Sequence, residues 1–233
     1  MIKVFALKKK VRIEQIAFNK LILSLSESSR EKINSKVFIH DKEIALLSQI
    51  LIRYSLLKGF DLKGNDIEID RTDFGKPFLR NHKNIFFNLT HSGDYVILAI
   101  SDKEVGIDIE QEKEIDIEIA DKFFSKSESK IISSAEDKDK KSIFFRMWTQ
   151  KESYLKAIGL GLSKPLDSFS VESISGDYKV IDSENLQRYP EWKLDYFIIE
   201  GNYHFSICSL ESFSRNSIQF LDSDFLIDQY LME

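Results

Sequence analysis

The sequence V-G-I-D-I-E at residues 105–110 organises the rest of the chain. Its apolar residues alternate with the others, which predicts a partly buried β-strand. Side chains two residues apart on a strand point to the same face, so the carboxylates of Asp108 and Glu110 are expected to lie side by side. The strand therefore presents two acidic groups to one neighbouring element.

A second segment, W-T-Q-K-E-S-Y-L-K at residues 148–156, is predicted to form the C-terminal part of a helix. Glu152 and Lys156 are four residues apart and lie on one side of such a helix. Gly159 and Gly161 follow and are expected to end it. If this helix packs on the acidic strand, three carboxylates and one ammonium group meet at one place.

These groups have the chemistry of a site for a divalent cation and a phosphate. Oxygen ligands without His or Cys favour a hard cation, and Mg²⁺ binds one or two carboxylates together with substrate phosphates. The predicted metal ligands are Asp108, Glu110 and Glu152, and Lys156 suits an anionic substrate or leaving group. Phosphoryl transfer is the natural chemistry of such a site. On spacing alone, a solvated acidic face with a helical Glu–Lys pair is an open and more common alternative.

Length and composition limit the other classes of function. The chain has 233 residues, 42% of them apolar, which suffices for one large domain or two small ones. A net charge of −5 argues against a general nucleic-acid binder, which is usually basic. Cys208 is the only cysteine, which excludes a disulfide framework and a thiolate metal site. With no signal-peptide pattern and no stretch of membrane-spanning length, we expect a soluble cytoplasmic protein.

The two acidic segments together resemble a known family of enzymes. V-G-I-D-I-E followed by W-T-Q-K-E-S-Y-L-K matches the pattern G-(I/V)-D-x-E and W-x-x-K-E-x-x-x-K of the 4′-phosphopantetheinyl transferases, in their larger, pseudo-dimeric Sfp type. The resemblance implies that the protein uses Mg²⁺ to transfer 4′-phosphopantetheine from coenzyme A to a serine of an apo carrier protein. The other product is adenosine 3′,5′-bisphosphate, and the carrier is an acyl or peptidyl carrier protein.

The same resemblance implies an α/β (α+β) fold of two similar halves, predicted as residues 1–103 and 104–233. Coenzyme A is expected in the cleft between them, with its nucleotide end on the first half. The second half is expected to hold Mg²⁺, the catalytic residues and the docking surface for the carrier. Because the cleft forms within one chain, we expect a monomer.

Two motifs of the first half are linked by the resemblance to the nucleotide end of coenzyme A. F-G-K-P at residues 74–77 by itself indicates a turn, and in the family its lysine, here Lys76, reaches a phosphate. F-N-L-T-H-S-G at residues 87–93 by itself indicates a hairpin. In the family its histidine, here His91, binds the 3′-phosphate.

Further residues are assigned to this end by the same resemblance. Thr90 is a weaker candidate beside the histidine, and Lys32 matches a phosphate-binding lysine. The polar segment 26–36 around Lys32 is otherwise expected to be a solvated connection. Ser29 and Ile44 stand where the family often has basic residues, so the phosphate pocket is expected to be less basic than usual.

The segment F-F-S-x-x-E at residues 123–128 also matches the family and places Glu128 near the active site. Phe123 and Phe124 cannot both face one side of a helix, so either both pack in the core or one is exposed for a partner helix. Lysines recur at every fourth position here and predict a basic stripe that suits an acidic carrier protein: Lys122, Lys126 and Lys130.

The predicted catalytic residues are Glu152, Lys156 and Glu110. Lys156 is expected to steady or protonate the leaving oxygen. Either Glu152 or a metal-bound hydroxide takes the proton of the serine, and the sequence leaves both open. Two other functions also stay open: a non-catalytic module that binds coenzyme A or a carrier domain, and a Mg²⁺-dependent phosphoanhydride hydrolase.

Overall fold

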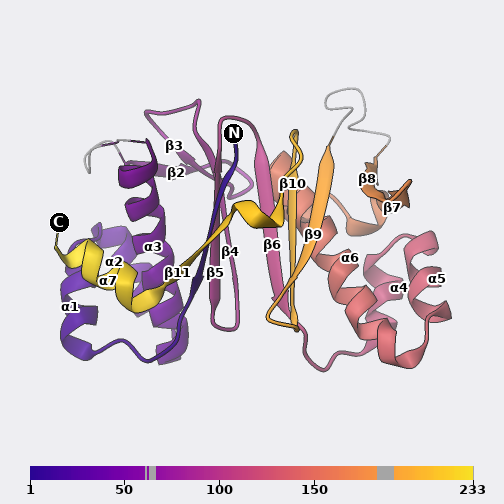
Figure 1. The fold of residues 1–233 in the computed structure, drawn as a ribbon, viewed down its shortest axis with the longest axis horizontal. Helices are drawn as coiled ribbons and strands as arrows, with labels where there is room; N and C mark the ends of the chain where they lie inside the picture. Colours follow the sequence, from indigo (N-terminus) through magenta and orange to yellow (C-terminus); the bar gives the residue numbers. More distant parts are fainter. Residues whose placement is uncertain (61, 63–66, 183–191, 233) are drawn as a thin grey trace.

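A computed structural model of the protein describes residues 1–60, 62, 67–182 and 192–232. Residues 61, 63–66, 183–191 and 233, which belong to the two predicted halves, lie outside the described residues. Figure 1 shows two groups of helices at the two sides of the molecule, with the strands between them. Among the described residues, no helix is long and apolar enough to cross a membrane.

The first layer is a four-stranded sheet in the order β11-β1-β5-β4, covered on one side by helices. Its elements in chain order are β1 (Lys3–Lys8), α1 (Gln15–Leu23), α2 (Glu27–Asn34), α3 (Ile39–Phe60), β4 (Phe86–Ser92) and β5 (Tyr95–Ser101). A small hairpin of β2 (Ile69–Arg71) and β3 (Pro77–Leu79) stands beside this layer. α3 buries apolar residues of nearly every turn, including the predicted core residues Ile44, Leu47 and Ile50.

The second layer is a five-stranded sheet in the order β6-β10-β9-β8-β7. Its elements in chain order are β6 (Val105–Gln111), α4 (Ala120–Phe123), α5 (Lys126–Ser134), α6 (Asp137–Ile158), β7 (Ser170–Ile174), β8 (Asp177–Ile181), β9 (Lys193–Ile199) and β10 (Tyr203–Ser209). Short 3₁₀ turns lie at Ile117–Ile119, Gly161–Ser163, Leu166–Ser168 and Arg215–Ser217. α6 packs on β6 and β10 and ends at Gly159, whose φ of +75° suits glycine.

One order of elements therefore occurs twice along the chain. Each occurrence has a first strand, a group of helices that ends with a helix of 22 residues, a small hairpin and two further strands. In each repeated unit the first strand pairs with the last strand of that unit, and this last strand pairs with the strand before it. The resulting orders are β1-β5-β4 and β6-β10-β9. The fold is thus of the predicted α/β class, with antiparallel pairing within each repeated unit.

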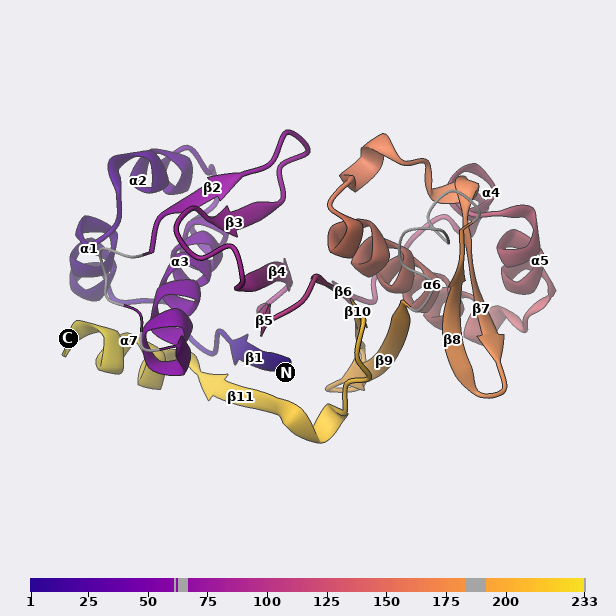
Figure 2. The same cartoon turned by 90° about the horizontal axis from the view of Figure 1, so that it is seen from above.

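The C-terminal segment leaves the second layer and returns to the first. β11 (Ile218–Asp222) pairs in parallel with β1, and α7 (Ser223–Leu231) packs on α3, as Figure 2 also shows. The side chains of Leu226 and Ile227 join the apolar core of the first layer. By its packing this segment belongs to the first half, which the predicted range 104–233 did not anticipate.

Two predictions of local structure were wrong. The polar segment 26–36 is mostly helical, because Ser26 caps α2 and Ile33 is buried beneath it. The lysines at 122, 126 and 130 do not share one helix, because the chain is extended at Phe124 between α4 and α5. Lys126 and Lys130 remain neighbours on α5, and all three lysines are exposed.

Candidate active site between the two layers

Gly106 allows α6 to lie directly on β6. A Cβ atom at this position would stand 2.1 Å from the carbonyl oxygen of Ser153 and 2.2 Å from the nitrogen of Ala157. No side chain fits in such a space, so the glycine of V-G-I-D-I-E sets the distance between strand and helix. The approach places Glu152 and Lys156 of α6 over the carboxylates of β6.

A cavity of about 370 Å³ lies at this contact and contains the predicted acidic residues. We call it the carboxylate cavity; it is lined by Leu89, Thr90, His91, Asp108, Glu110, Trp148, Glu152 and Lys156. The structure thus brings together all three predicted metal ligands and the predicted catalytic lysine. Trp148, four residues before Glu152 on α6, also lines the cavity.

The three carboxylates are held in different ways. Asp108 is buried, and its Oδ1 lies 2.6 Å from Lys156 Nζ and accepts a hydrogen bond from Thr90 Oγ1 at 3.2 Å. Glu110 Oε2 accepts a hydrogen bond from Ser92 Oγ at 2.9 Å. Glu152 forms no hydrogen bond or ion pair within the ranges that the structure describes. Of the three, Glu152 is thus the carboxylate whose oxygens are available.

Burial and mutual repulsion disfavour the charged forms of the three carboxylates. Burial raises the pKa of Glu110 and of Glu152, and the charge of Asp108 raises both further. Burial also raises the pKa of Asp108, and Lys156 and Thr90 oppose this change. A cation between the three carboxylates relieves the repulsion that one lysine offsets only in part.

The donor set fits a hard divalent cation. Asp108 Oδ2 is buried without a hydrogen-bond partner among the described residues, and the ligands on offer are oxygen atoms. As the side chains lie, no group of three or more His, Cys, Asp or Glu residues in the described ranges has the spacing of a metal site. Lys156 takes the place next to Asp108.

β4 explains the motif F-N-L-T-H-S-G. Its alternate side chains Asn88, Thr90 and Ser92 point toward β6, where they accept hydrogen bonds from backbone N–H groups. Leu89 and His91 lie on the other face of the strand and line a second cavity. Thr90 is therefore occupied by β6, Asp108 and Lys156, and its weaker predicted role on coenzyme A gains no support from these contacts.

The second cavity, of about 650 Å³, lies on the first half, and we call it the basic cavity. Its charged and titratable lining residues are Lys32, Lys36, Arg53, Glu68, Arg71, Arg80 and His91. Lys32, Lys36 and Arg53 form no ion pair with any described residue, and the buried Nε of Arg53 has no hydrogen-bond partner there. Such a group of cations, in a chain of net charge −5, has the character of an anion site.

The two cavities share Leu89 and His91 of β4. His91 therefore lies at the border between the two cavities. Burial and the nearby Lys156 and Lys36 lower the pKa of His91, and a phosphate beside the ring acts in the opposite direction. An elongated ligand can therefore reach from the basic cavity to the carboxylates along one strand.

The remaining predicted nucleotide residues fall into two groups. Lys32 and Ser29 line the basic cavity, as expected for the phosphate end. Ile44 is 3% exposed and packs in the core, so its side chain does not bear on how basic the cavity is. Lys76 lines neither of these cavities, because its Nζ binds Glu104 and, at 2.7 Å, the carbonyl oxygen of Ala157. A phosphate contact of Lys76 stays a prediction, and it requires that the ammonium group leave these two partners.

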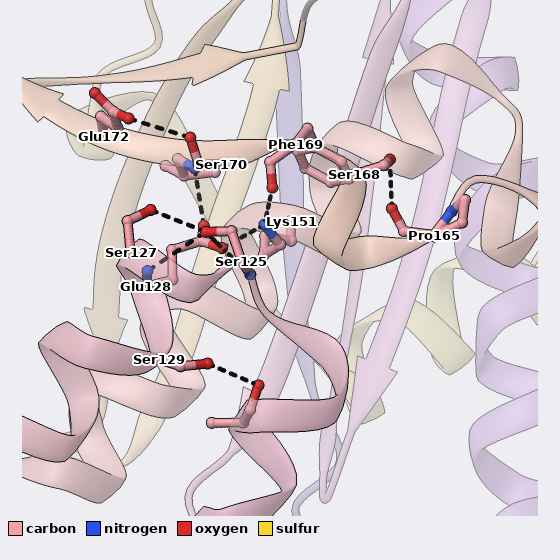
Figure 3. A network of polar contacts seen from close by, with 12 residues as sticks. Ser125, Ser127, Glu128, Ser129, Lys151, Pro165, Ser168, Phe169, Ser170 and Glu172 are labelled. Atoms are coloured by element: carbon pink, nitrogen blue, oxygen red, sulfur yellow. Dashed lines mark hydrogen bonds and ion pairs between the residues drawn. The ribbon is translucent and has the colours of Figure 1, made fainter.

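Glu128 does not line the carboxylate cavity; it binds Lys151, the residue before Glu152. Its Oε2 accepts hydrogen bonds from Ser125 and from Lys151 Nζ at 2.7 Å, and its Oε1 accepts one from the Val171 N–H at 2.9 Å. Figure 3 shows this network, in which Lys151 also donates to the carbonyl oxygen of Phe169 at 2.5 Å. The pair is fully buried and joins α5, α6 and β7. Both residues are matched by the family motifs, yet their contacts here are structural.

Of the two alternatives for Phe123 and Phe124, the structure has the one in which one ring packs in the core and the other is exposed. Phe124 is 3% exposed and packs against Phe144, whereas Phe123 is 37% exposed. Phe123 contacts the ring of Trp148 edge to face, at 5.9 Å between ring centroids. An exposed aromatic ring therefore stands next to a wall of the carboxylate cavity.

Sequence reasoning missed four cations of the basic cavity and the serine hydroxyl group that donates a hydrogen bond to Glu110. Lys36, Arg53, Arg71 and Arg80 come from separate elements, and nothing in their local sequence joins them. Ser92 carried a readable signal, because it follows Asn88 and Thr90 at the alternation of a strand. That alternation is meaningful only when β6 is known to be the neighbour.

Comparison with known proteins agrees with this geometry. Two family models match adjacent parts of the chain: the 4′-phosphopantetheinyl transferase superfamily over residues 104–208, and the N-terminal part of 4′-phosphopantetheinyl transferases over residues 13–103. The 4′-phosphopantetheinyl transferase gsp of Aneurinibacillus migulanus is 35% identical over 216 residues, which cover 93% of this chain and 89% of that protein.

Two relatives from Bacillus subtilis show similar identity over shorter regions. The 4′-phosphopantetheinyl transferase Sfp is 37% identical over 63% of this chain and 66% of its own length. The 4′-phosphopantetheinyl transferase ffp is 36% identical over 68% of this chain and 71% of its own length. The chain belongs to the 4′-phosphopantetheinyl transferase superfamily.

Proposed function

We propose that the protein transfers the 4′-phosphopantetheine group of coenzyme A to a serine of an apo carrier protein, with Mg²⁺ in the carboxylate cavity. The observation that carries the proposal is that the two cavities adjoin, with Leu89 and His91 in the lining of both. Coenzyme A has a 3′-phosphate at one end of its nucleotide and a pyrophosphate at the other. A basic cavity joined to an acidic, metal-binding one matches this distribution of charge.

The nucleotide end would bind to the first half. Lys32, Lys36 and Arg53 have no competing ion pair among the described residues, so their charges are available to the 3′-phosphate. His91 is close to both cavities and is suited to a phosphate between them. These contacts would fix the pyrophosphate over the carboxylates, and correct placement alone lowers the barrier of a transfer reaction substantially.

The reacting end would bind to the second half. Asp108, Glu110 and Glu152 would hold Mg²⁺, which when bound offsets the negative charge of the pyrophosphate. In the transfer, the serine oxygen forms a bond to the β-phosphorus, the bond from that phosphorus to the bridging oxygen breaks, and adenosine 3′,5′-bisphosphate leaves. Lys156, with its Nζ at the centre of the site, is suited to neutralise the leaving oxygen.

Glu152 is the side chain best suited to take the proton of the serine. Its carboxylate has no hydrogen-bond donor among the described residues, whereas Lys156 and Thr90 contact Asp108 and Ser92 contacts Glu110. Glu110 and Lys156 complete the proposed catalytic set.

The carrier protein would dock beside Trp148. Phe123 offers an exposed ring there, and Lys126 and Lys130 of α5 offer positive charge to an acidic carrier. In this arrangement one chain contains both cavities, so a monomer suffices for activity. The two halves have separate tasks: the first binds the nucleotide, and the second binds the metal and the carrier.

The decisive test is the mass of an apo acyl or peptidyl carrier protein after incubation with this protein, coenzyme A and Mg²⁺. A mass gain of one phosphopantetheine group is expected, and EDTA should abolish it. Coenzyme A consumed without any gain in carrier mass would identify a hydrolase instead. Tight binding of coenzyme A without transfer to any of several carriers would identify a binding module.

A further inference from the structure

β4 and β6 face each other across a row of side chains instead of a backbone ladder. Asn88 Oδ1 accepts a hydrogen bond from the Ile107 N–H at 2.9 Å, and Ser92 Oγ accepts one from the Gln111 N–H at 3.0 Å. Thr90 Oγ1 occupies the middle of the row. These bonds satisfy the outward N–H groups of an edge strand and join the two layers.

Ser92 has a second contact that involves the carboxylate cavity. Its hydroxyl proton goes to Glu110 Oε2 at 2.9 Å, while its oxygen accepts from Gln111. The two bonds use different parts of the hydroxyl group, which has one proton to donate and two lone pairs to accept. The Gln111 N–H therefore orients the hydroxyl group that orients Glu110.

The position of Ser92 is itself fixed by the turn that follows. Gly93 has φ +52°, and a Cβ atom there would lie 2.5 Å from Tyr203 Oη and 2.6 Å from Gln111 Oε1. The Asp94 N–H donates to the same Tyr203 hydroxyl at 3.4 Å. Strand β10 thus holds the end of the hairpin, and Ser92 has little freedom to move.

Glu110 depends on this contact. The Ser92 hydroxyl is the one hydrogen-bond donor that reaches its carboxylate from the described residues. Its neighbour Asp108 repels it, so a Glu110 without this bond would turn toward solvent. We propose that Ser92 is a positioning residue that holds Glu110 in the carboxylate cavity and so sets the affinity for the divalent cation. This inference rests on the proposed function, which assigns the cation to that cavity.

The test is the binding of Mn²⁺ as a paramagnetic probe, measured by electron paramagnetic resonance without carrier protein, both with and without coenzyme A. Ser92→Ala should weaken Mn²⁺ binding about tenfold or more, as loss of a hydrogen bond on a metal ligand commonly does. Ser92→Thr keeps the hydroxyl group and should restore the affinity to within about twofold. Affinity for coenzyme A should be the same in all three proteins.

Ser55→Ala is the control for loss of a serine hydroxyl group, because Ser55 lies on α3 and lines neither cavity. It should leave Mn²⁺ affinity unchanged. Mn²⁺ binding to Ser92→Ala as tight as to the wild type would overturn the proposal, as would a Ser92→Thr protein as weak as Ser92→Ala. A wild type that binds no Mn²⁺ would overturn it as well. A wild type that shows this Mn²⁺ pattern but transfers no phosphopantetheine to any carrier would instead refute the proposed function alone.

Discussion

The N-terminal ends of α2 and α5 are built alike, yet they differ in their cation. Arg53 beside α2 faces a cavity without an ion-pair partner among the described residues, whereas Lys151 beside α5 is held in a buried ion pair. Ser26 caps α2 and is followed three residues later by Ser29, while Ser125 caps α5 and is followed three residues later by Glu128. Near these ends stand Arg53 and Lys151, which occupy the same position in two helices of 22 residues each.

The difference between the two ends is one carboxylate. In the second half, Glu128 binds Lys151 at 2.7 Å, and both are fully buried. In the first half, the equivalent place holds Ser29, and Arg53 faces a cavity without an ion-pair partner among the described residues. A cation paired inside the protein holds elements together, whereas an unpaired one beside a cavity is left for a ligand. One scaffold thus provides structure in one half and a binding site in the other.

The largest effect in this comparison is expected for Lys151→Met. It leaves Glu128 buried without its cation, which costs about 3–5 kcal/mol of unfolding free energy. Chemical denaturation of the wild type and the variant measures the change. The double variant Lys151→Met, Glu128→Gln is the control and should recover part of the loss. A Lys151→Met protein as stable as the wild type would show that the ion pair does not hold α5, α6 and β7 together.

Lys156→Ala should have the next largest effect, and on activity instead of stability. Loss of a charge that acts on the leaving oxygen is expected to lower turnover about 10²–10³-fold, with a much smaller change in affinity for coenzyme A. Steady-state kinetics of carrier modification measure both quantities. Lys103→Ala, a change in an exposed ion pair far from the cavities, serves as control. Equal losses of turnover and of affinity would contradict a role on the leaving group.

Arg53→Met tests the unpaired cation beside the N-terminal end of α2. It removes a charge from the basic cavity without breaking an ion pair among the described residues, so the free energy of unfolding should change little. Affinity for coenzyme A should fall about tenfold, the loss typical of one charge-assisted hydrogen bond. Isothermal titration with coenzyme A measures it. A loss of the same size for dephospho-coenzyme A, which lacks the 3′-phosphate, would exclude a contact between Arg53 and that phosphate.

The smallest effect is expected on the pH dependence of stability, through a buried histidine of the second half. His204 lies between Tyr196 and Glu112, and burial lowers its pKa from the ordinary value of 6.5. The folded state then binds fewer protons than the unfolded state below pH 6.5, so stability falls as the pH drops from 6.5 toward the folded pKa. His204→Gln should reduce this slope in melting temperatures measured between pH 7 and pH 5. An unchanged slope would show that other groups cause the acid sensitivity.

Much of the carboxylate cavity could be predicted from the sequence because its geometry is local. A strand fixes Asp108 and Glu110 on one face, and a helix fixes Glu152 and Lys156 on one side, whatever the rest of the chain does. The structure adds the reason for Gly106, which lets α6 lie directly on β6. The resemblance to the family then joined two local patterns that neither spacing alone could connect.

The other residues depended on contacts between distant parts of the chain. The sequence did not show that the end of α6 lies beside the hairpin of Lys76 and accepts a hydrogen bond from its ammonium group. Nor did it show that Glu128, predicted near the active site, is held by Lys151. The position of the C-terminal segment could not be predicted, because the place of β11 in the sheet depends on its pairing with the distant strand β1.

The sequence by itself determined the acidic strand, the helix that carries Glu152 and Lys156, and the acidic and cationic side chains at the centre of the site, and the resemblance of these motifs to a family indicated the class of fold. Alternation and helical spacing are properties of a single element, so they can be read before the fold is known. Only the tertiary structure decided which cations stay unpaired, which carboxylates are neutralised and which hydroxyl groups orient them. Those outcomes depend on which charges lie within a few ångströms of one another, and the packing of separate elements sets these distances.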